Sequence, residues 1–148
     1  MKETGRAVVR EAQAKDIPAL ARLAGELGYP TEESQMRRRF DRVMTDPEHR
    51  VYVAESVAGA VIGWVHVHLT RYLATDLRGE LAGLIVAATA RSRGIGAQLL
   101  GAAEAWTRAQ GAELLSLRSN VTRKDAHRFY ERLGYTVTKT SLNFRKAL

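Results

Sequence analysis

The sequence predicts one α/β (α+β) domain over residues 1–148, with a mixed sheet flanked by about four helices. Three observations support this class. Segments rich in β-formers occur between segments of helical periodicity. The apolar run around Ile85, the amphipathic segment from Ile95 and the apolar run around Leu115 form a βαβ unit, which requires a parallel pair of strands. The strands before that unit are joined as hairpins, so we expect them to be antiparallel.

The N-terminal third is expected to form a short strand and two helices. The strand covers residues 6–10. Asp16 can cap the first helix, whose apolar periodicity ends at Gly28. The second helix covers about residues 32–44 and stops before Pro47, because the residue preceding a proline disfavours helical geometry.

Three strands follow in the middle of the chain. They are predicted over residues 51–55, 61–69 and 77–86, which are rich in β-branched and aromatic side chains. Gly79 and Gly83 lie inside the third of these strands. Glycine in a strand interior indicates a bulge or a close approach of another part of the protein.

The C-terminal part alternates helix and strand. A strongly amphipathic helix is predicted over residues 95–110 and a buried strand over residues 114–117. A further helix over residues 125–133 leads into a last strand over residues 135–144.

Composition excludes several classes of protein. Hydrophobic residues make up 45% of the 148 residues, which argues against disorder. The absence of cysteine excludes disulfides and a cysteine nucleophile. No apolar stretch is long enough to span a bilayer, and no secretory signal is visible, so we expect a cytoplasmic protein without membrane contact.

The net charge of +7 favours a polyanionic partner, either nucleic acid or a polyphosphate cofactor. Arg37, Arg38, Arg39 and Arg42 contribute to it. They fall in a helical pattern with apolar residues, which is typical of a solvated helix face, and no aromatic residues interleave with them to stack bases. Nucleic acid is therefore not the expected partner.

A glycine-containing loop lies between the predicted strand 77–86 and the helix 95–110. The first amides of a helix have no acceptors within it and lie at the positive end of the helix dipole, so they can bind a phosphate. A plain strand-to-helix turn remains the alternative. A Walker loop is excluded because Ala97 and Gln98 follow the last glycine. The loop consists of Arg91, Ser92, Arg93, Gly94, Ile95, Gly96 and Ala97.

The segment from Leu84 to Leu100, which contains this loop, resembles motif A of the Gcn5-related N-acetyltransferases (GNAT). The segment from Ala126 to Tyr135 resembles the second signature of that family, Ala-x-x-Phe-Tyr-x-x-x-Gly-Tyr. The two occur in the family's order, and the resemblance covers nearly the whole chain. It implies a mostly antiparallel sheet with a parallel, splayed pair of strands at its centre.

The resemblance also implies acetyl-CoA (coenzyme A) as the cofactor. The backbone of Leu84, Ile85 and Val86 would then pair with the pantetheine arm. The amides of residues 91–97 would hold the pyrophosphate.

Three polar residues outside the loop are further cofactor candidates. Either Asn120 or Arg123 would contact the cofactor, because the family often carries an asparagine at the position of Arg123. His127 is interpreted as a packing residue or a phosphate contact.

The resemblance implies that Tyr130 is the general acid. A phenol with a pKa of about 10 stays protonated at neutral pH and can donate to the departing thiolate; simple packing beside Phe129 is the alternative. Glu80 is the candidate base, or it binds the acceptor ammonium. His66 and His68 share one strand face and are alternative bases; they resemble a metal couple, but no third ligand is visible, so no metal is expected.

The acceptor is expected to be a primary amine of a small molecule or of a protein, bound near Tyr29 and Tyr72. A homodimer is possible. The alternative function is a CoA-binding module that keeps the fold but is catalytically silent, as a sensor or interaction protein.

Overall fold

The computed structural model describes residues 7–148, and within them five strands form one mixed sheet. Neighbouring strands from β1 to β4 are antiparallel, and β4 and β5 are parallel. This confirms the predicted class. In spatial and chain order the strands are β1 (Val8–Glu11), β2 (His49–Glu55), β3 (Val61–Tyr72), β4 (Thr75–Val86) and β5 (Leu115–Ser116).

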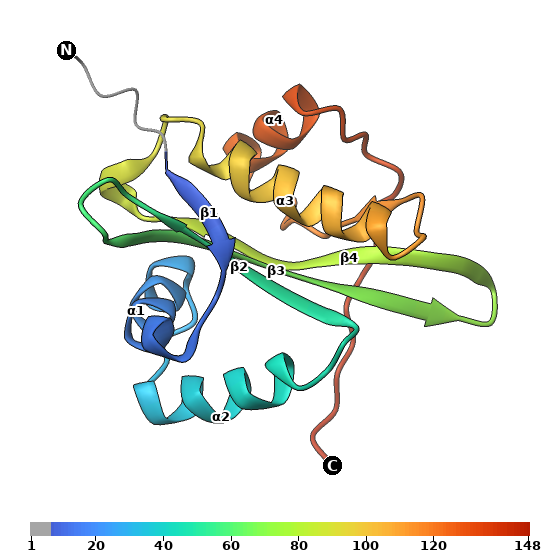
Figure 1. Ribbon diagram of the computed structural model, residues 1–148. Coiled ribbons are helices and arrows are strands. Elements are labelled where there is room, and N and C mark those ends of the chain that lie inside the picture. The colour runs from blue at the N-terminus through green and yellow to red at the C-terminus, as the bar shows by residue number, and fades with distance from the viewer. Residues whose placement is uncertain (1–6) are drawn as a thin grey trace. The chain divides into compact units, whose positions relative to one another are not determined.

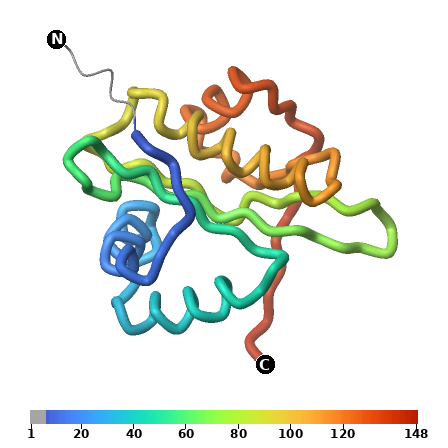
Figure 2. Tube along the Cα trace, in the orientation of Figure 1, coloured from blue at the N-terminus to red at the C-terminus, as the bar shows by residue number. Residues whose placement is uncertain are grey.

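Four α-helices accompany the sheet in the described part of the chain. They are α1 (Ile17–Leu27), α2 (Glu33–Met44), α3 (Ile95–Ala109) and α4 (Lys124–Arg132). Helices α1 and α2 lie on one face of the sheet and α3 lies on the other (Figure 1). The long hairpin of β3 and β4 extends beyond the end of β2 (Figure 2).

The chain divides into two compact units after Leu117. The first unit contains the sheet and helices α1, α2 and α3. The second, residues 118–148, contains α4 and the C-terminal segment.

The core of the first unit is built from the inner faces of the helices and the sheet. The apolar stripe of α3 packs on β3 and β4, and that of α1 packs on the opposite face. Each fully buried aliphatic side chain contributes roughly 1.5–3 kcal/mol. The largest of them are Ile17, Leu23, Val53, Val65, Val67, Ile95, Leu99 and Leu100. The arginines of α2 are exposed, as predicted.

Strand β4 contains the predicted bulge and close approach. The register with β3 shifts between the pairs His66–Gly83 and Val67–Leu81, which leaves Ala82 as the extra residue. A Cβ at Gly79 would lie 2.6 Å from Thr107 Cγ2 of α3, so only glycine lets the helix pack this closely. The bulge changes the direction of β4 beside the candidate site.

The predicted last strand, residues 135–144, is wrong. The described backbone forms no ladder there, and Val137, Leu142 and Phe144 are largely exposed. Strand propensity is not sufficient, because a strand requires a partner for its hydrogen bonds. The parallel pair of β4 and β5 consequently lies at an edge of the described sheet and not at its centre.

Two N-terminal expectations are refined. Helix α1 begins directly after Asp16, but the Asp16 carboxylate makes no capping bond to it. Instead it accepts hydrogen bonds from Arg10 and from the backbone N–H of Gln13. The first strand begins at Val8; position 6 of its predicted range lies outside the described residues.

Candidate active site

The glycine loop presents backbone amides at the start of α3. The first backbone hydrogen bond of this helix is donated by Gln98 N–H to Gly94 O. The N–H groups of Ile95, Gly96 and Ala97 come before it and have no acceptor within the helix. Ser92 and Gly94 have left-handed backbones, with φ of 66° and 78°. Left-handed residues in a turn create the concavity of N–H groups that binds anions, and the helix dipole adds to it.

The arginines of the loop are exposed. Arg91 Nε donates to the carbonyl oxygen of Val86 at 3.2 Å, which ties the loop to the end of β4. Arg93 is also exposed, whereas Ile95 is buried and anchors the start of the helix in the core. The loop is therefore rigidly attached and carries positive charge on its outer side.

Strand β4 offers an open edge beside this loop. It pairs with β5 at Gly79 and Glu80 alone, so among residues 7–117 its later part has no second neighbour. The N–H of Ala87 donates to Ile62 O on β3. Because backbone groups alternate in direction along a strand, those of Leu84 and Val86 are turned to the open edge and those of Ile85 face β3.

These two features fit CoA. The edge at Leu84 and Val86 can pair with an extended amide-bearing chain such as pantetheine. The amides of residues 95–97 can accept a pyrophosphate. The pairing of β4 with β5 ends at Glu80 and Ser116, so the backbone of β4 beyond Glu80 is not paired to β5.

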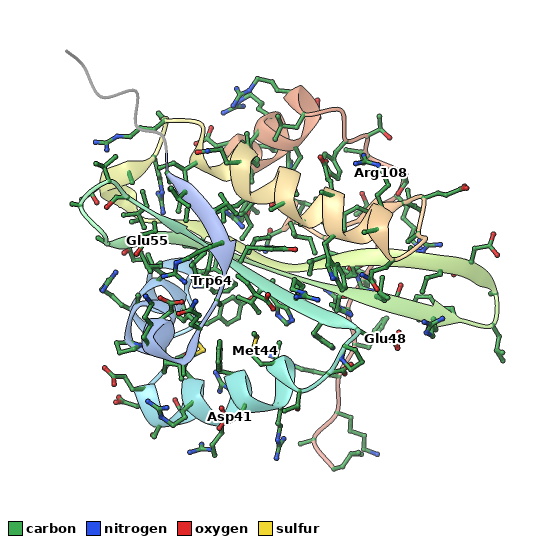
Figure 3. The ribbon with its side chains drawn as sticks, in the orientation of Figure 1. Asp41, Met44, Glu48, Glu55, Trp64 and Arg108 are labelled. Carbon is green, nitrogen blue, oxygen red and sulfur yellow. The ribbon has the colours of Figure 1, made fainter. Side chains whose placement is uncertain are left out.

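Polar side chains gather on the face of β3 and β4 opposite α3. Gly79 faces α3, so its neighbours Arg78 and Glu80 point to the other face, where α1 and α2 lie. His66 and His68 share that face, since His68 pairs with Glu80 across the strands. Figure 3 shows Met44 of α2 pointing toward the same side of the sheet.

A third histidine completes a cluster on this face. His49 of β2 pairs with His68 in the ladder, and their rings stack with centroids 4.9 Å apart. His49 Nδ1 and His66 Nε2 are hydrogen-bonded at 2.8 Å, and His49 Nε2 lies 3.7 Å from Asp46 Oδ2. Burial, and then the neighbouring imidazoles, lower the pKa of His66 to about 4. No group of three or more potential ligands among the described residues can hold a metal ion.

Two buried donors on this face lack acceptors among the described residues. They are Trp64 Nε1 and Arg78 Nε. The Trp64 ring covers Gly83, since a Cβ at Gly83 would lie 2.8 Å from it. Glu80 accepts a hydrogen bond of 2.5 Å from Ser116 Oγ, which fixes its carboxylate. Orphaned buried donors are uncommon in proteins and indicate a place where a ligand or water binds.

Tyr130 lies on α4, in the second unit. Its ring makes edge contacts with Phe129 and Tyr135, at centroid distances of 5.1 and 5.9 Å. Burial raises the pKa of the Tyr130 phenol, and the charge of Arg123 partly opposes this. The phenol is thus protonated at neutral pH and can donate a proton.

The other candidates of the second unit organise the start of α4. Asn120 Oδ1 accepts hydrogen bonds from the backbone and hydroxyl of Thr122. His127 Nε2 is bonded to the backbone oxygen of Asn120 at 2.8 Å. Arg123 is the N-cap residue, directly before the first residue of the helix. The structure therefore brings Asn120 and His127 together, and both make local contacts.

The predicted acceptor residues lie on two separate connections. Tyr29 follows α1 and is 70% exposed, and Tyr72 ends β3 and is 58% exposed. Within residues 7–148, no hydrogen bond or ring contact joins Tyr29 or Tyr72 to His49, His66 or His68.

Sequence reasoning missed His49, Arg78 and Trp64. Arg78 could have been found from its spacing of two from Glu80, which places both on one face of a strand. Trp64 was on the same predicted face as His66, but nothing in the sequence indicated an unpaired indole. His49 could not be found, because its contact with His66 depends on strand register.

Comparison with known proteins agrees with this geometry. Residues 15–135 match the acetyltransferase (GNAT) family. The chain is 42% identical over 142 residues to the aminoalkylphosphonate N-acetyltransferase of Salmonella typhimurium strain LT2, which covers 95% of this chain and 90% of that protein.

Solved structures show the same fold. A transcriptional regulator from Bacillus halodurans C-125 superposes with a TM-score of 0.84 at 27% identity, covering 95% of this chain and 100% of that one. The aminoglycoside N-acetyltransferase AAC(6')-Iy in complex with CoA gives a TM-score of 0.86 at 16% identity, covering 97% and 96%.

Proposed function

We propose, for a chain that belongs to the acetyltransferase (GNAT) family, that the acetyl acceptor is a small primary amine carrying an anionic group. The chain is an N-acetyltransferase, and acetyl-CoA is its cofactor. No helix among the described residues is long and apolar enough to cross a membrane. A protein amine as acceptor, a homodimer and a cytoplasmic location stay predictions.

The observation that carries the proposal is the pair of opposite charges on one face of β4. Arg78 and Glu80 are two residues apart, which separates their Cα atoms by roughly 6.5–7 Å. A carboxylate favours the ammonium end of an acceptor, and a guanidinium with an unpartnered Nε favours its anionic end. The relative at 42% identity is named for aminoalkylphosphonates, which combine these two groups.

The reaction requires binding and two proton transfers. Acetyl-CoA, when bound, supplies the acetyl group, whose carbonyl carbon becomes bonded to the amine nitrogen as the carbon–sulfur bond breaks. The amides of residues 95–97 and the edge at Leu84 and Val86 would hold the cofactor, and Glu80 would orient the acceptor ammonium. The protonated phenol of Tyr130 would serve as the donor for the departing thiolate.

Substrate comparison tests the acceptor class. The purified protein is assayed by thiol release with an aminoalkylphosphonate, with an alkylamine of equal chain length, and with the corresponding phosphonate that lacks the amine. We expect the aminoalkylphosphonate to have the highest kcat/KM and the amine-free phosphonate to give no reaction.

The variant Arg78→Gln provides the matched control. Loss of a charge-assisted contact is expected to raise KM for the aminoalkylphosphonate by about 10- to 100-fold. KM for the alkylamine, which lacks the anionic group, is expected to change little. Equal effects on both substrates would contradict the role of Arg78. Retained CoA binding without acetylation of any amine would favour the catalytically silent module.

A further inference from the structure

We propose that His66 is the general base that deprotonates the acceptor amine, and that His49 and Asp46 are positioning residues that fix its tautomer and lead the proton to solvent. The proposal rests on the acceptor site proposed above. It assigns to Glu80 the binding of the ammonium and not the removal of its proton.

The position of His66 separates it from Glu80. Glu80 lies where β4 is still paired with β5, and its carboxylate is bonded to Ser116. His66 pairs with Gly83, which follows the bulge and lies where β4 has lost its β5 neighbour among residues 7–117. We place the meeting of acetyl group and amine along this part of β4, and His66 lies opposite it on the neighbouring strand β3, so we assign His66 as the base.

The surroundings of His49 define which nitrogen of His66 is free. Asp46 Oδ2 lies 3.7 Å from His49 Nε2, which is too long for a hydrogen bond, but its negative charge favours a proton on that nitrogen. His49 Nδ1 is then the acceptor in the 2.8 Å bond, and His66 Nε2 is the donor. The Nδ1 of His66 consequently carries a lone pair, and the structure gives it no hydrogen-bond partner among the described residues.

The proton balance is simple. One N–H bond of the acceptor ammonium breaks, and an N–H bond forms at His66 Nδ1. The proton on His66 Nε2 can pass to His49 Nδ1, and the proton on His49 Nε2 can pass through one bridging water to Asp46, whose Oδ2 lies 3.7 Å away. The Asp46 side chain is 47% exposed and that of His49 is 27% exposed, so this series of proton-carrying groups leads from the buried face to water.

The surroundings keep the imidazoles neutral. Burial, and then the other histidines, lower the pKa of His66 to about 4, and burial also lowers the pKa of His49. Helix α2 presents the uncharged Phe40 and Met44 to this face. A neutral imidazole is available throughout the physiological range. The charged or titratable groups nearest His66 on its own face of the sheet are His49, His68, Arg78 and Glu80, and Asp46 and Glu48 lie just before β2.

The pH dependence of kcat/KM distinguishes His66 from Glu80. If a base holds the amine proton in the transition state, the reacting forms are the ammonium and the neutral base. The wild-type kcat/KM is then flat from about pH 6 to the amine pKa of about 10. In His66→Gln only the free amine reacts, so kcat/KM rises tenfold per pH unit and is about 100-fold or more below wild type at pH 7.

Two matched variants complete this test. Glu80→Gln is expected to raise the acceptor KM and keep the flat profile. His68→Gln, which removes a stacked ring but no bond to His66, is also expected to keep it. A steep profile in Glu80→Gln together with a flat one in His66→Gln would overturn the assignment, as would a steep wild-type profile.

A second measurement does not depend on turnover. The ¹⁵N shifts of the imidazoles in the cofactor-free protein report which nitrogens carry protons. We expect His66 protonated at Nε2 and bare at Nδ1, and we expect Asp46→Asn to mix the tautomers of His49. Protonation of His66 at Nδ1 refutes the proposal. If no amine is acetylated but these tautomers are found, the proposed class of acceptor amine is wrong, whereas the proposed arrangement of protons on His66 and His49 is correct.

Discussion

At the scale of single residues, the phenol of Tyr130 illustrates how burial suits a side chain to its chemistry. Burial raises the pKa of the Tyr130 phenol, so the phenol keeps its proton at neutral pH. Phe129 and Tyr135 hold the ring by edge contacts. The hydroxyl is therefore free to act as a proton donor, whereas the ring itself is fixed by packing.

The substitution Tyr130→Phe tests this role. It keeps the edge contacts and removes the donor, so we expect kcat to fall about 10²- to 10⁴-fold with the melting temperature nearly unchanged. Steady-state kinetics and cofactor binding by calorimetry check it. Full turnover with normal cofactor affinity would leave Tyr130 as a packing residue.

At the scale of elements, the ion pair of Arg10 and Asp16 links β1 to the start of α1. The guanidinium donates two bonds of 2.8 Å to a carboxylate that is 3% exposed. Burial alone would raise the pKa of Asp16, but these bonds and that from the Gln13 N–H outweigh it and lower the pKa. A well-satisfied buried charge of this kind depends on each of its partners.

The substitution Arg10→Met should therefore lower the free energy of unfolding by roughly 3–5 kcal/mol, because it leaves the Asp16 charge buried without its partner. Arg71→Met is the control. It breaks an ion pair with Glu48 in which Arg71 is 64% exposed, and it should cost less than about 1 kcal/mol. Urea denaturation measures both losses of unfolding free energy. Equal losses would show that the buried ion pair contributes no more to stability than the exposed one.

At the scale of the whole molecule, His66 couples global stability to pH. Its pKa is about 4 in the folded protein and 6.5 in the unfolded chain. Between these values the unfolded chain binds a proton that the folded protein does not, so stability falls as pH drops. The loss is about 1.4 kcal/mol per pH unit and at most about 3 kcal/mol in total.

Stability is expected to be constant above pH 6.5 and to decline from there toward pH 4. Urea midpoints across this range measure the decline. His66→Gln should reduce the decline, leaving the part that comes from the lowered pKa of His49 and the further loss at lower pH, where Asp16 is protonated. An unchanged decline in the variant would assign the proton uptake to another group.

Much of the fold was predictable because it rests on local patterns. The helices α1, α2, α3 and α4 begin and end within about two residues of the predicted bounds, since apolar periodicity and glycine or proline ends are properties of neighbouring residues. The bulge in β4 was indicated by its own glycines. The last strand failed because a strand is completed by a partner elsewhere in the chain.

The sequence by itself determined the order of the elements, the glycine loop at the start of α3 and the family signatures, since each depends on residues close together in the chain. The tertiary structure decided which side chains meet. Strand register, which is set by packing over the whole sheet, places His49 against His66. The turn between β1 and α1 brings Arg10 to Asp16. Such contacts join residues that local periodicity treats as independent, so the folded chain alone reveals the imidazole pair formed across β2 and β3.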